Sequence, residues 1–372
     1  MQLNNVALIN SDQSIGLGLE ARRVRVSSNK IEFVTPARAL TSTESNYRTQ
    51  ILTAVPDGMD EPFENPVFEL IGHFSLPEVQ SLRLKNGVFA KRMQAYRSHV
   101  HRYSSVLTKF YPRIDKQPVL EERDIRSLVD LQLYSEFDII AIPEPAIDGK
   151  VDDFERNVQR FSDYIKDKGA EPMPYIDMKN DNAVFREKLS KVVQNIPNIR
   201  CLGLAFRSHS DKYPNFRAIG EVAGAENLWI HVSNVPRFQS RATSLAQMHL
   251  PQTYSIDTTA LESRAVLAPL KVKPIQRIRK FVEGTLGETK LEDISTGKEP
   301  DSACACPICS ATKRKGTAMI GGTLLQTDTC YKVHEVFCST EEFGNSRDSI
   351  KNGDMKSYIQ SKKYLNLTLS SV

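Results

Sequence analysis

Short apolar runs alternate with segments of helical spacing through the second half of the chain. The runs that predict buried strands are 137–142, 173–176, 199–206, 228–232 and 254–256. The segments with helical spacing are 154–165, 185–193 and 241–248. Buried strands that alternate with helices are typical of βα units around a parallel sheet, either a barrel or an open doubly wound sheet. Each run ends in polar or charged residues, and in a βα barrel such strand ends form the active-site face.

The N-terminal part has a different pattern. Residues 23–34 alternate polar and apolar positions on both sides of a turn at Ser28-Asn29, which predicts a β-hairpin. Residues 41–66 are polar and contain several prolines, so we expect a loop there. Residues 77–111 carry long basic side chains and little glycine or proline, which favours a largely helical segment.

The composition is that of an ordinary folded protein. The 372 residues are 40% hydrophobic and 25% charged, which excludes a mostly disordered, collagen-like or coiled-coil chain. No apolar run is long enough to span a bilayer, and the N-terminus lacks the pattern of a signal peptide. We therefore expect a cytoplasmic protein with no membrane partner. The net charge of +4 neither requires nor excludes a nucleic-acid partner.

Cysteine is the most informative residue type in this sequence. Five of the six cysteines lie between Cys304 and Cys338, and a tight cluster in a large chain points to a metal rather than to disulfides. The candidate metal ligands are Cys304, Cys306, Cys309 and His334. Three thiolates and one imidazole complete a closed tetrahedral site, so we expect one structural Zn²⁺ per chain.

Two alternatives to this ligand set stay open. The cysteines could form a reduced cluster without a metal, or Cys330 could replace His334 as the fourth ligand. Cys338 is spare in the expected set, and Cys201 lies in an apolar run and is expected in the core.

The C-x-C-x-x-C motif with a histidine about 25 positions further on resembles the zinc motif of the tRNA-guanine transglycosylase superfamily. Members of that superfamily are (β/α)8 barrels that exchange a guanine base in nucleic acid for a 7-deazaguanine. The resemblance implies an α/β fold, a (β/α)8 TIM-type barrel with an N-terminal β-hairpin and a C-terminal zinc-binding subdomain. The implied division is 1–284 for the barrel with its hairpin and 285–372 for the zinc-binding subdomain with a C-terminal helical segment.

Other stretches follow the family's order along the chain. The hairpin closes on Thr35-Pro36-Ala37, which is similar to the Thr-Pro-Ala of the family hairpin. Glu144 resembles the Glu of the family's Asp-Glu pair, with Pro143 at the Asp position, and Asp177 falls where the family has a base-contacting Gln. The remaining matches are Gly203 and Leu204, which resemble the strand whose backbone recognises the base, and Asp257, which resembles the nucleophilic Asp.

One departure from the family concerns Lys85, which stands where a second essential Asp is expected. Such erosion is similar to the DNA-modifying branch, the DpdA-type DNA-guanine transglycosylases, which insert 7-cyano-7-deazaguanine into DNA. The resemblance therefore implies a pentosyltransferase whose partners are DNA and a 7-deazaguanine base. The alternatives are a tRNA-modifying enzyme and a non-catalytic, zinc-containing subunit that binds nucleic acid. A helper ATPase or helicase and a homodimer are further partners that analogy allows.

Base exchange requires a nucleophile at the anomeric carbon of the sugar and a group that moves a proton to and from the bases. We expect Asp257 to form a covalent Asp–glycosyl intermediate. The alternative is a structural role, in which Asp257 caps the N-terminus of a helix. Glu144 and Asp177 are candidates for acid–base work and for reading the guanine edge, unless they are ordinary loop carboxylates. Arg207 is a candidate to hold a phosphate or the base, and Asn234 to contact ribose.

Basic residues gather in two clusters, at 271–280 and at 313–315. They could follow a nucleic-acid backbone, or they could form solvated charged faces. The discriminating observation between an enzyme and a binding subunit is whether Asp257, Glu144 and Asp177 converge on one cavity.

Overall fold

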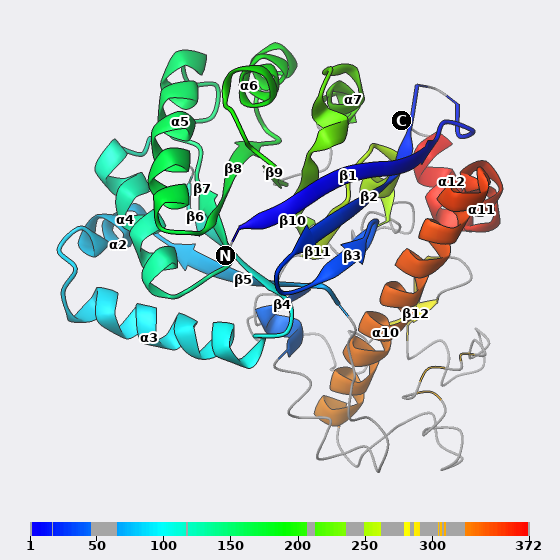
Figure 1. Ribbon diagram of the computed structural model, residues 1–372. Coiled ribbons are helices and arrows are strands. Elements are labelled where there is room, and N and C mark those ends of the chain that lie inside the picture. Colours follow the sequence, from blue (N-terminus) through cyan, green and yellow to red (C-terminus); the bar gives the residue numbers. More distant parts are fainter. Residues whose placement is uncertain are drawn as a thin grey trace.

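The computed structural model describes residues 2–16, 18–45, 65–116, 118–206, 213–235, 249–261, 279–282, 286–290 and 324–370, together with Cys304, Cys306 and Cys309. Eight parallel strands close into a barrel (Figure 1). In chain order they are β4 (Ala37–Thr41), β5 (Val67–Phe74), β6 (Leu107–Ile114), β7 (Ile139–Ile142), β8 (Glu171–Asp177), β9 (Cys201–Ala205), β10 (Trp229–Val235) and β11 (Thr258–Leu261). β11 pairs with β4 to complete the ring, which confirms the expected TIM-type barrel.

Helices follow most of the strands and surround the barrel (Figure 1). They are α2 (Leu76–Leu82), α3 (Gly87–Arg102), α4 (Glu122–Tyr134), α5 (Val151–Asp167), α6 (Asn182–Asn195) and α7 (Tyr213–Glu221), with short 3-10 turns η1 (Ala225–Asn227) and η2 (Leu250–Thr253). The helices predicted at 154–165 and 185–193 are confirmed as α5 and α6. The helix predicted at 241–248 lies outside the described residues.

Four of the five predicted strands are confirmed as β7, β8, β9 and β10, and the fifth is wrong. Within 254–256, Tyr254 makes only an isolated bridge with Glu20, and the eighth barrel strand begins only at Thr258. The helical segment predicted over 77–111 is confirmed as α2 and α3, but its last residues belong to β6. The sequence of β6 does not read as an apolar run, because Lys109 and Arg113 give the strand polar positions.

A three-stranded antiparallel sheet covers the N-terminal end of the barrel. It consists of β1 (Leu3–Asp12), β2 (Ala21–Ser28) and β3 (Glu32–Val34), and the β2–β3 pair confirms the predicted hairpin. Val24 and Val26 belong to one core cluster with Val67 and Trp229 from inside the barrel. Because the sheet closes this end, ligands are expected at the opposite end, where the strands have their carboxyl ends.

The C-terminal part packs against the barrel and the hairpin sheet. The helix α10 (Leu324–Asn352) contacts β1, β2 and β4, and Arg347 Nη1 donates to the carbonyl oxygen of Pro36 at 2.8 Å. Two helices, α11 (Met355–Ser361) and α12 (Lys363–Ser370), follow it, and a short ribbon, β12 (Arg279–Val282) and β13 (Gly287–Lys290), precedes it. The division of the chain at 284 stays a prediction. No helix within the described residues is long and apolar enough to cross a membrane.

Candidate functional site

A pocket opens at the C-terminal ends of β6, β7, β8 and β9. Its lining residues are Tyr111, Pro112, Ile114, Pro118, Leu120, Pro143, Glu144, Ala146, Ile147, Tyr175, Asp177 and Ala205. The rings of Tyr111 and Tyr175 stack with their centroids 5.3 Å apart and their planes at 30°. The pocket is therefore lined by two aromatic rings, which are only 2% and 3% exposed, and by two carboxyl groups. Two of the residues predicted for the site, Glu144 and Asp177, come together in it.

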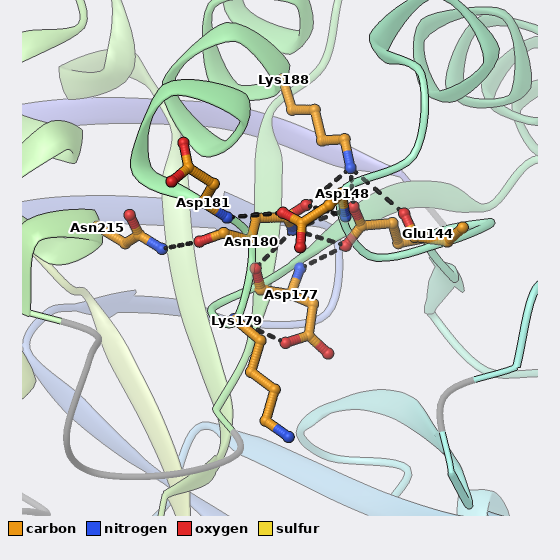
Figure 2. Close-up of polar contacts among 9 residues, drawn as sticks. Glu144, Asp148, Asp177, Lys179, Asn180, Asp181, Lys188 and Asn215 are labelled. Atoms are coloured by element: carbon orange, nitrogen blue, oxygen red, sulfur yellow. Dashed lines mark hydrogen bonds and ion pairs between the residues drawn. The ribbon is translucent and has the colours of Figure 1, made fainter.

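Glu144 is held by several donors at once (Figure 2). Its Oε2 accepts from the backbone N–H of Asp177 at 2.7 Å, and both carboxyl oxygens accept from Asn180 Nδ2 at 3.1 Å. The buried Lys188 ammonium forms an ion pair with Oε1 and also donates to Asn180 Oδ1 at 2.8 Å. Burial raises the pKa of Glu144 to about 7, against the lowering effect of Lys188. A carboxyl group with this pKa can hold or release a proton near neutral pH.

Asp177 ends strand β8 and is 4% exposed. Its Oδ1 accepts from the backbone N–H of Lys179 at 2.9 Å, which fixes one side of the carboxylate (Figure 2). Asn180 Nδ2 donates to the carbonyl oxygen of Asp177 at 2.7 Å, so the segment after the strand turns back under Glu144. The contacts of Glu144 and Asn180 thus position the backbone of Asp177 at the pocket.

Asp257 does not reach this pocket. It precedes β11 instead of ending a strand, so it lies at the N-terminal end of the barrel and is 0% exposed. Arg22 holds both of its oxygens, Thr35 Oγ1 donates to Oδ1 at 3.2 Å, and the backbone N–H of Ile230 donates to Oδ2 at 2.6 Å. The expectation that Asp257 stands at the barrel mouth is wrong, because the strand that was to present it there begins one residue later.

Burial raises the pKa of Asp257, and the Arg22 guanidinium opposes this shift. The arrangement is that of a structural ion pair between the hairpin and the bottom of the barrel. Glu144 and Asp177 therefore converge on one cavity, and Asp257 lies at the other end of the barrel.

The remaining predicted residues lie at different depths. Asn234 is at the mouth, where Nδ2 donates to the Phe206 carbonyl oxygen at 2.9 Å and Oδ1 accepts from Arg113 Nη1 at 3.0 Å. Gly203 lies below the pocket, and a side chain there would meet the Tyr175 ring at 2.5 Å. Leu204 of β9 is fully buried and faces outward, in the core between the barrel strands and the surrounding helices. Arg207 lies outside the described residues, as do the cluster at 313–315 and most of the cluster at 271–280.

Lys85 is not at a strand end. It lies between α2 and α3, where its Nζ forms an ion pair with Asp130 Oδ2 at 2.8 Å and approaches the Tyr134 ring. Lys85 therefore does not lie at the barrel mouth, and its alignment with the family's second Asp stays a prediction. The residue near the carboxyl end of the second barrel strand is His73, which is exposed and pairs in register with Arg113 of β6.

A buried polar network fills the barrel interior below the pocket, and sequence reasoning missed it. Lys109 forms an ion pair with Glu69 on the neighbouring strand and donates to the hydroxyl oxygen of Tyr175 at 2.6 Å. Ser233 Oγ donates to Glu69 Oε2 at 2.7 Å and contacts the Tyr175 hydroxyl at 2.7 Å. The signal that could have revealed the network is the alternation in β5 and β6. Glu69 and Lys109 each lie two residues from apolar residues that point to the same face of the strand, the barrel interior.

His231 completes the network on the far side of Glu69. The ionised Glu69 carboxylate can only accept, so His231 Nε2–H donates to Glu69 Oε2 at 2.7 Å. His231 Nδ1 lies 2.7 Å from Thr258 Oγ1, which also accepts from Trp229 Nε1 at 2.9 Å. Burial lowers the pKa of His231 to about 4, which agrees with this tautomer. Burial alone would raise the pKa of Glu69, but Lys109 and His231 outweigh it and lower the pKa to about 2.

The thiol cluster of the C-terminal part is buried and compact. The ligand atoms of Cys304, Cys306, His334 and Cys338 all lie within 4.8 Å of one another, and Cys309 Sγ is 3.5 Å from His334 Nδ1. Such a cluster of soft donors suits a d¹⁰ ion such as Zn²⁺. All four predicted ligands therefore lie together, and Cys338, which was expected to be spare, lies beside them. Cys330 is not in this group, although it is buried on the same helix.

No protein-family model matches the chain, and no curated protein matches it. The structure is similar to barrels at very low sequence identity. The YdjI aldolase from Escherichia coli K12 is 9% identical, with 83% of this chain and 92% of that chain covered and a TM-score of 0.38. The 3-hexulose-6-phosphate synthase from Salmonella typhimurium is 11% identical, with 61% and 89% covered and a TM-score of 0.36. The closed ring of parallel strands and the buried thiols by themselves define a TIM-type βα barrel with a thiol cluster. The resemblance to guanine transglycosylases rests on the quoted residues alone.

Proposed function

We propose that this chain is a base-exchange transglycosylase that replaces guanine in DNA by a 7-deazaguanine at the barrel mouth. The observation that carries the proposal is the convergence of Asp177 and Glu144 on a pocket with the stacked rings of Tyr111 and Tyr175. A flipped purine stacks on aromatic faces, and a carboxylate accepts from its polar edge. The carboxyl ends of barrel strands are also where barrel enzymes place their active sites.

In this proposal Asp177 takes the nucleophilic role that the sequence had given to Asp257. An oxygen of Asp177 attacks the anomeric carbon, the bond from that carbon to the guanine nitrogen breaks, and the electron pair leaves with the base. Glu144, with a pKa of about 7, supplies the proton that neutralises the leaving guanine. The incoming 7-deazaguanine returns a proton to Glu144, attacks the same carbon, and releases the Asp177 carboxylate.

Zn²⁺ has a structural part in this proposal. A closed site of thiolates and imidazole leaves no position for substrate, so the metal supplies folding energy to the C-terminal part and no chemistry at the pocket. The helper ATPase or helicase and the homodimer stay predictions.

The test is a base-exchange assay with the zinc-loaded full-length protein. Labelled guanine or 7-cyano-7-deazaguanine is offered with duplex DNA, single-stranded DNA and tRNA in parallel. We expect label in DNA, and loss of at least about 100-fold in rate for Asp177→Asn because the nucleophile is removed. Asp181→Asn is the matched control, since Asp181 caps α6 four residues away and Asn caps equally well.

A second candidate is a non-catalytic subunit that binds nucleic acid, and the burial of Asp257 in a structural ion pair favours it. Label entering tRNA alone would replace DNA by tRNA as the substrate. Label in no nucleic acid, combined with DNA binding that Asp177→Asn leaves unchanged, would contradict the enzyme and support the binding subunit.

A further inference from the structure

A guanidinium group crosses the barrel mouth, and the proposed chemistry does not use it. Arg113 lies between Pro112 and Ile114, which both line the pocket. Its Nη1 donates to Asn234 Oδ1 of β10 at 3.0 Å. The strands β6 and β10 are four strands apart in either direction around the closed ring of eight. A side chain of β6 that contacts β10 therefore reaches over the barrel interior.

We propose that Arg113 binds a phosphate group of the nucleic-acid strand whose base enters the pocket. The identity of this ligand rests on the proposed function, whereas the position of the cation at the mouth does not. A guanidinium is planar and always charged, and its N–H donors match phosphate oxygens in pairs. The bond to Asn234 fixes the orientation of the group before a ligand arrives, which lowers the entropy cost of binding.

The alternation of side chains along β5 and β6 places Arg113 at the mouth. Residues two positions apart on a strand share a face. Tyr111 of β6 and Ile71 of β5 belong to the core cluster inside the barrel. Arg113 and His73 each follow one of these residues by two positions, and they are paired in register. Both side chains therefore face inward at the carboxyl ends of their strands.

The acceptor that orients Arg113 is itself held in place. Asn234 Nδ2 donates to the Phe206 carbonyl oxygen at 2.9 Å, so Oδ1 of the same amide faces Arg113. Exchange of the two ends of this amide would lose both bonds, so the contacts define its orientation. The φ of Asn234 is 63°, in the left-handed region that Asn enters more readily than most residues. Arg113 is thus held by an amide whose own position is fixed.

The charges at the mouth supply the reason for a phosphate. Glu144 and Asp177 line the pocket, and the buried Lys188 is the ion-pair partner of Glu144. A phosphodiester that brings its base to Asp177 adds a negative charge near that carboxylate, and like charges repel. Arg113 offsets this repulsion from an inward-facing position two strands away from Asp177. Such a contact positions the strand without reading its sequence.

The experiment measures how the full-length protein binds a short fluorescent strand of DNA, by anisotropy at several salt concentrations. We expect Arg113→Gln to weaken binding about 10-fold and to reduce the slope of log K against log salt by about 0.7, the share of one phosphate on a single strand. Arg113→Lys keeps the charge but not the paired donors, so it should keep the slope and still lose affinity. A retained slope also shows that this variant folds.

Arg97→Gln is the matched control. Arg97 lies on α3 outside the barrel and forms an ion pair with Glu136, which precedes β7 at the opposite end of the barrel. The substitution removes the same charge from the protein, so Arg97→Gln should bind the strand with the affinity and the slope of the wild type. An equal loss in Arg97→Gln and Arg113→Gln would show an effect of net charge alone and would overturn the proposal.

A second measurement identifies the phosphate. A set of strands is prepared, each with one neutral methylphosphonate linkage at a different position. For the wild-type protein, one linkage should cost about 10-fold in affinity when it is neutral. For Arg113→Gln the same linkage should cost nothing further, because its partner is already gone. Losses that add independently at every linkage would overturn the contact.

Two further outcomes separate this inference from its alternatives. Calorimetric binding of inorganic phosphate that requires Arg113, together with strand binding that does not, would overturn the phosphodiester in favour of a small phosphorylated ligand. Arg113→Gln with the affinity and slope of the wild type would overturn the proposal and leave base exchange at Asp177 untouched. Conversely, binding of one linkage that depends on Arg113, without transfer of label in the base-exchange assay, would contradict the enzyme and support this inference.

Discussion

At the scale of single residues, the floor of the pocket depends on the absence of a side chain. The Tyr175 ring occupies the space beside Gly203 where a Cβ atom would lie, at 2.5 Å from the nearest ring carbon. The same ring stacks on Tyr111, and its hydroxyl is anchored by Lys109. The family resemblance gives Gly203 a role in base recognition through its backbone, and the structure adds a packing reason for glycine.

Gly203→Ala should therefore destabilise the protein by about 1–3 kcal/mol, the usual cost of overpacking a buried position. The tyrosine ring must move, so guanine binding at the pocket should weaken as well. Chemical denaturation and equilibrium dialysis with labelled guanine measure the two effects. Gly220→Ala is the matched control: nothing lies within 4 Å of its added Cβ, and alanine in the helix α7 should be neutral or slightly stabilising. Equal stabilities for the two variants would rule out this packing argument.

At the scale of elements, the hairpin sheet is fastened to the barrel by one buried ion pair. Arg22 of β2 holds Asp257 before β11, and Arg22 also donates to the carbonyl oxygens of Ala225 and Leu228 at 2.9 and 2.7 Å. Thr35, after β3, donates to the same carboxylate. One carboxylate thus connects the closing sheet, the turn before β10 and the start of β11.

Asp257→Asn should leave the Arg22 charge buried without its partner, which typically costs about 3–5 kcal/mol. A lowered midpoint of urea unfolding is the expected result, together with little change in base exchange per folded molecule. Lys30 and Asp138 form a second ion pair between the hairpin and the barrel that is more exposed, so Asp138→Asn should cost less. If Asp257→Asn kept its stability and lost only activity, the structural reading of Asp257 would be wrong and the nucleophile would return to this position.

The elements that the sequence predicts well are those with a simple pattern. The apolar runs of β7, β9 and β10 are buried on both faces, and α5 and α6 carry a clear helical spacing. The barrel interior breaks this pattern at β5 and β6, where Glu69 and Lys109 neutralise each other across neighbouring strands. Such a pair is recognised only when the register is known, which is why both strands and the network were missed. Cys338 was missed for a similar reason, since the motif spacing already offered four ligands.

At the scale of the whole molecule, buried titratable groups make stability depend on pH in opposite directions. Burial lowers the pKa of His231 to about 4 and of His249 to about 3, so the unfolded chain takes up protons first as the pH falls below 6.5. Each histidine should therefore cost about 2 kcal/mol of stability between pH 7 and pH 5. Glu144 has the opposite effect on stability, because its pKa is about 7 in the folded protein and its ordinary value is 4.5. The folded chain binds that proton first, which returns about 2 kcal/mol over the same range.

The free energy of unfolding should then fall by about 2 kcal/mol from pH 7 to pH 5 in the wild-type protein. Glu144→Gln removes the opposing contribution, so the fall should grow to about 4 kcal/mol even if the variant is less stable at every pH. The quantity to compare is this slope, measured by urea unfolding at several pH values, and not the absolute stability, which also contains the loss of the Lys188 ion pair. Identical slopes would show that Glu144 stays ionised down to pH 5. The proton that the leaving base needs would then have to come from another group at the barrel mouth, and His73, exposed near the end of β5, would be the first to substitute.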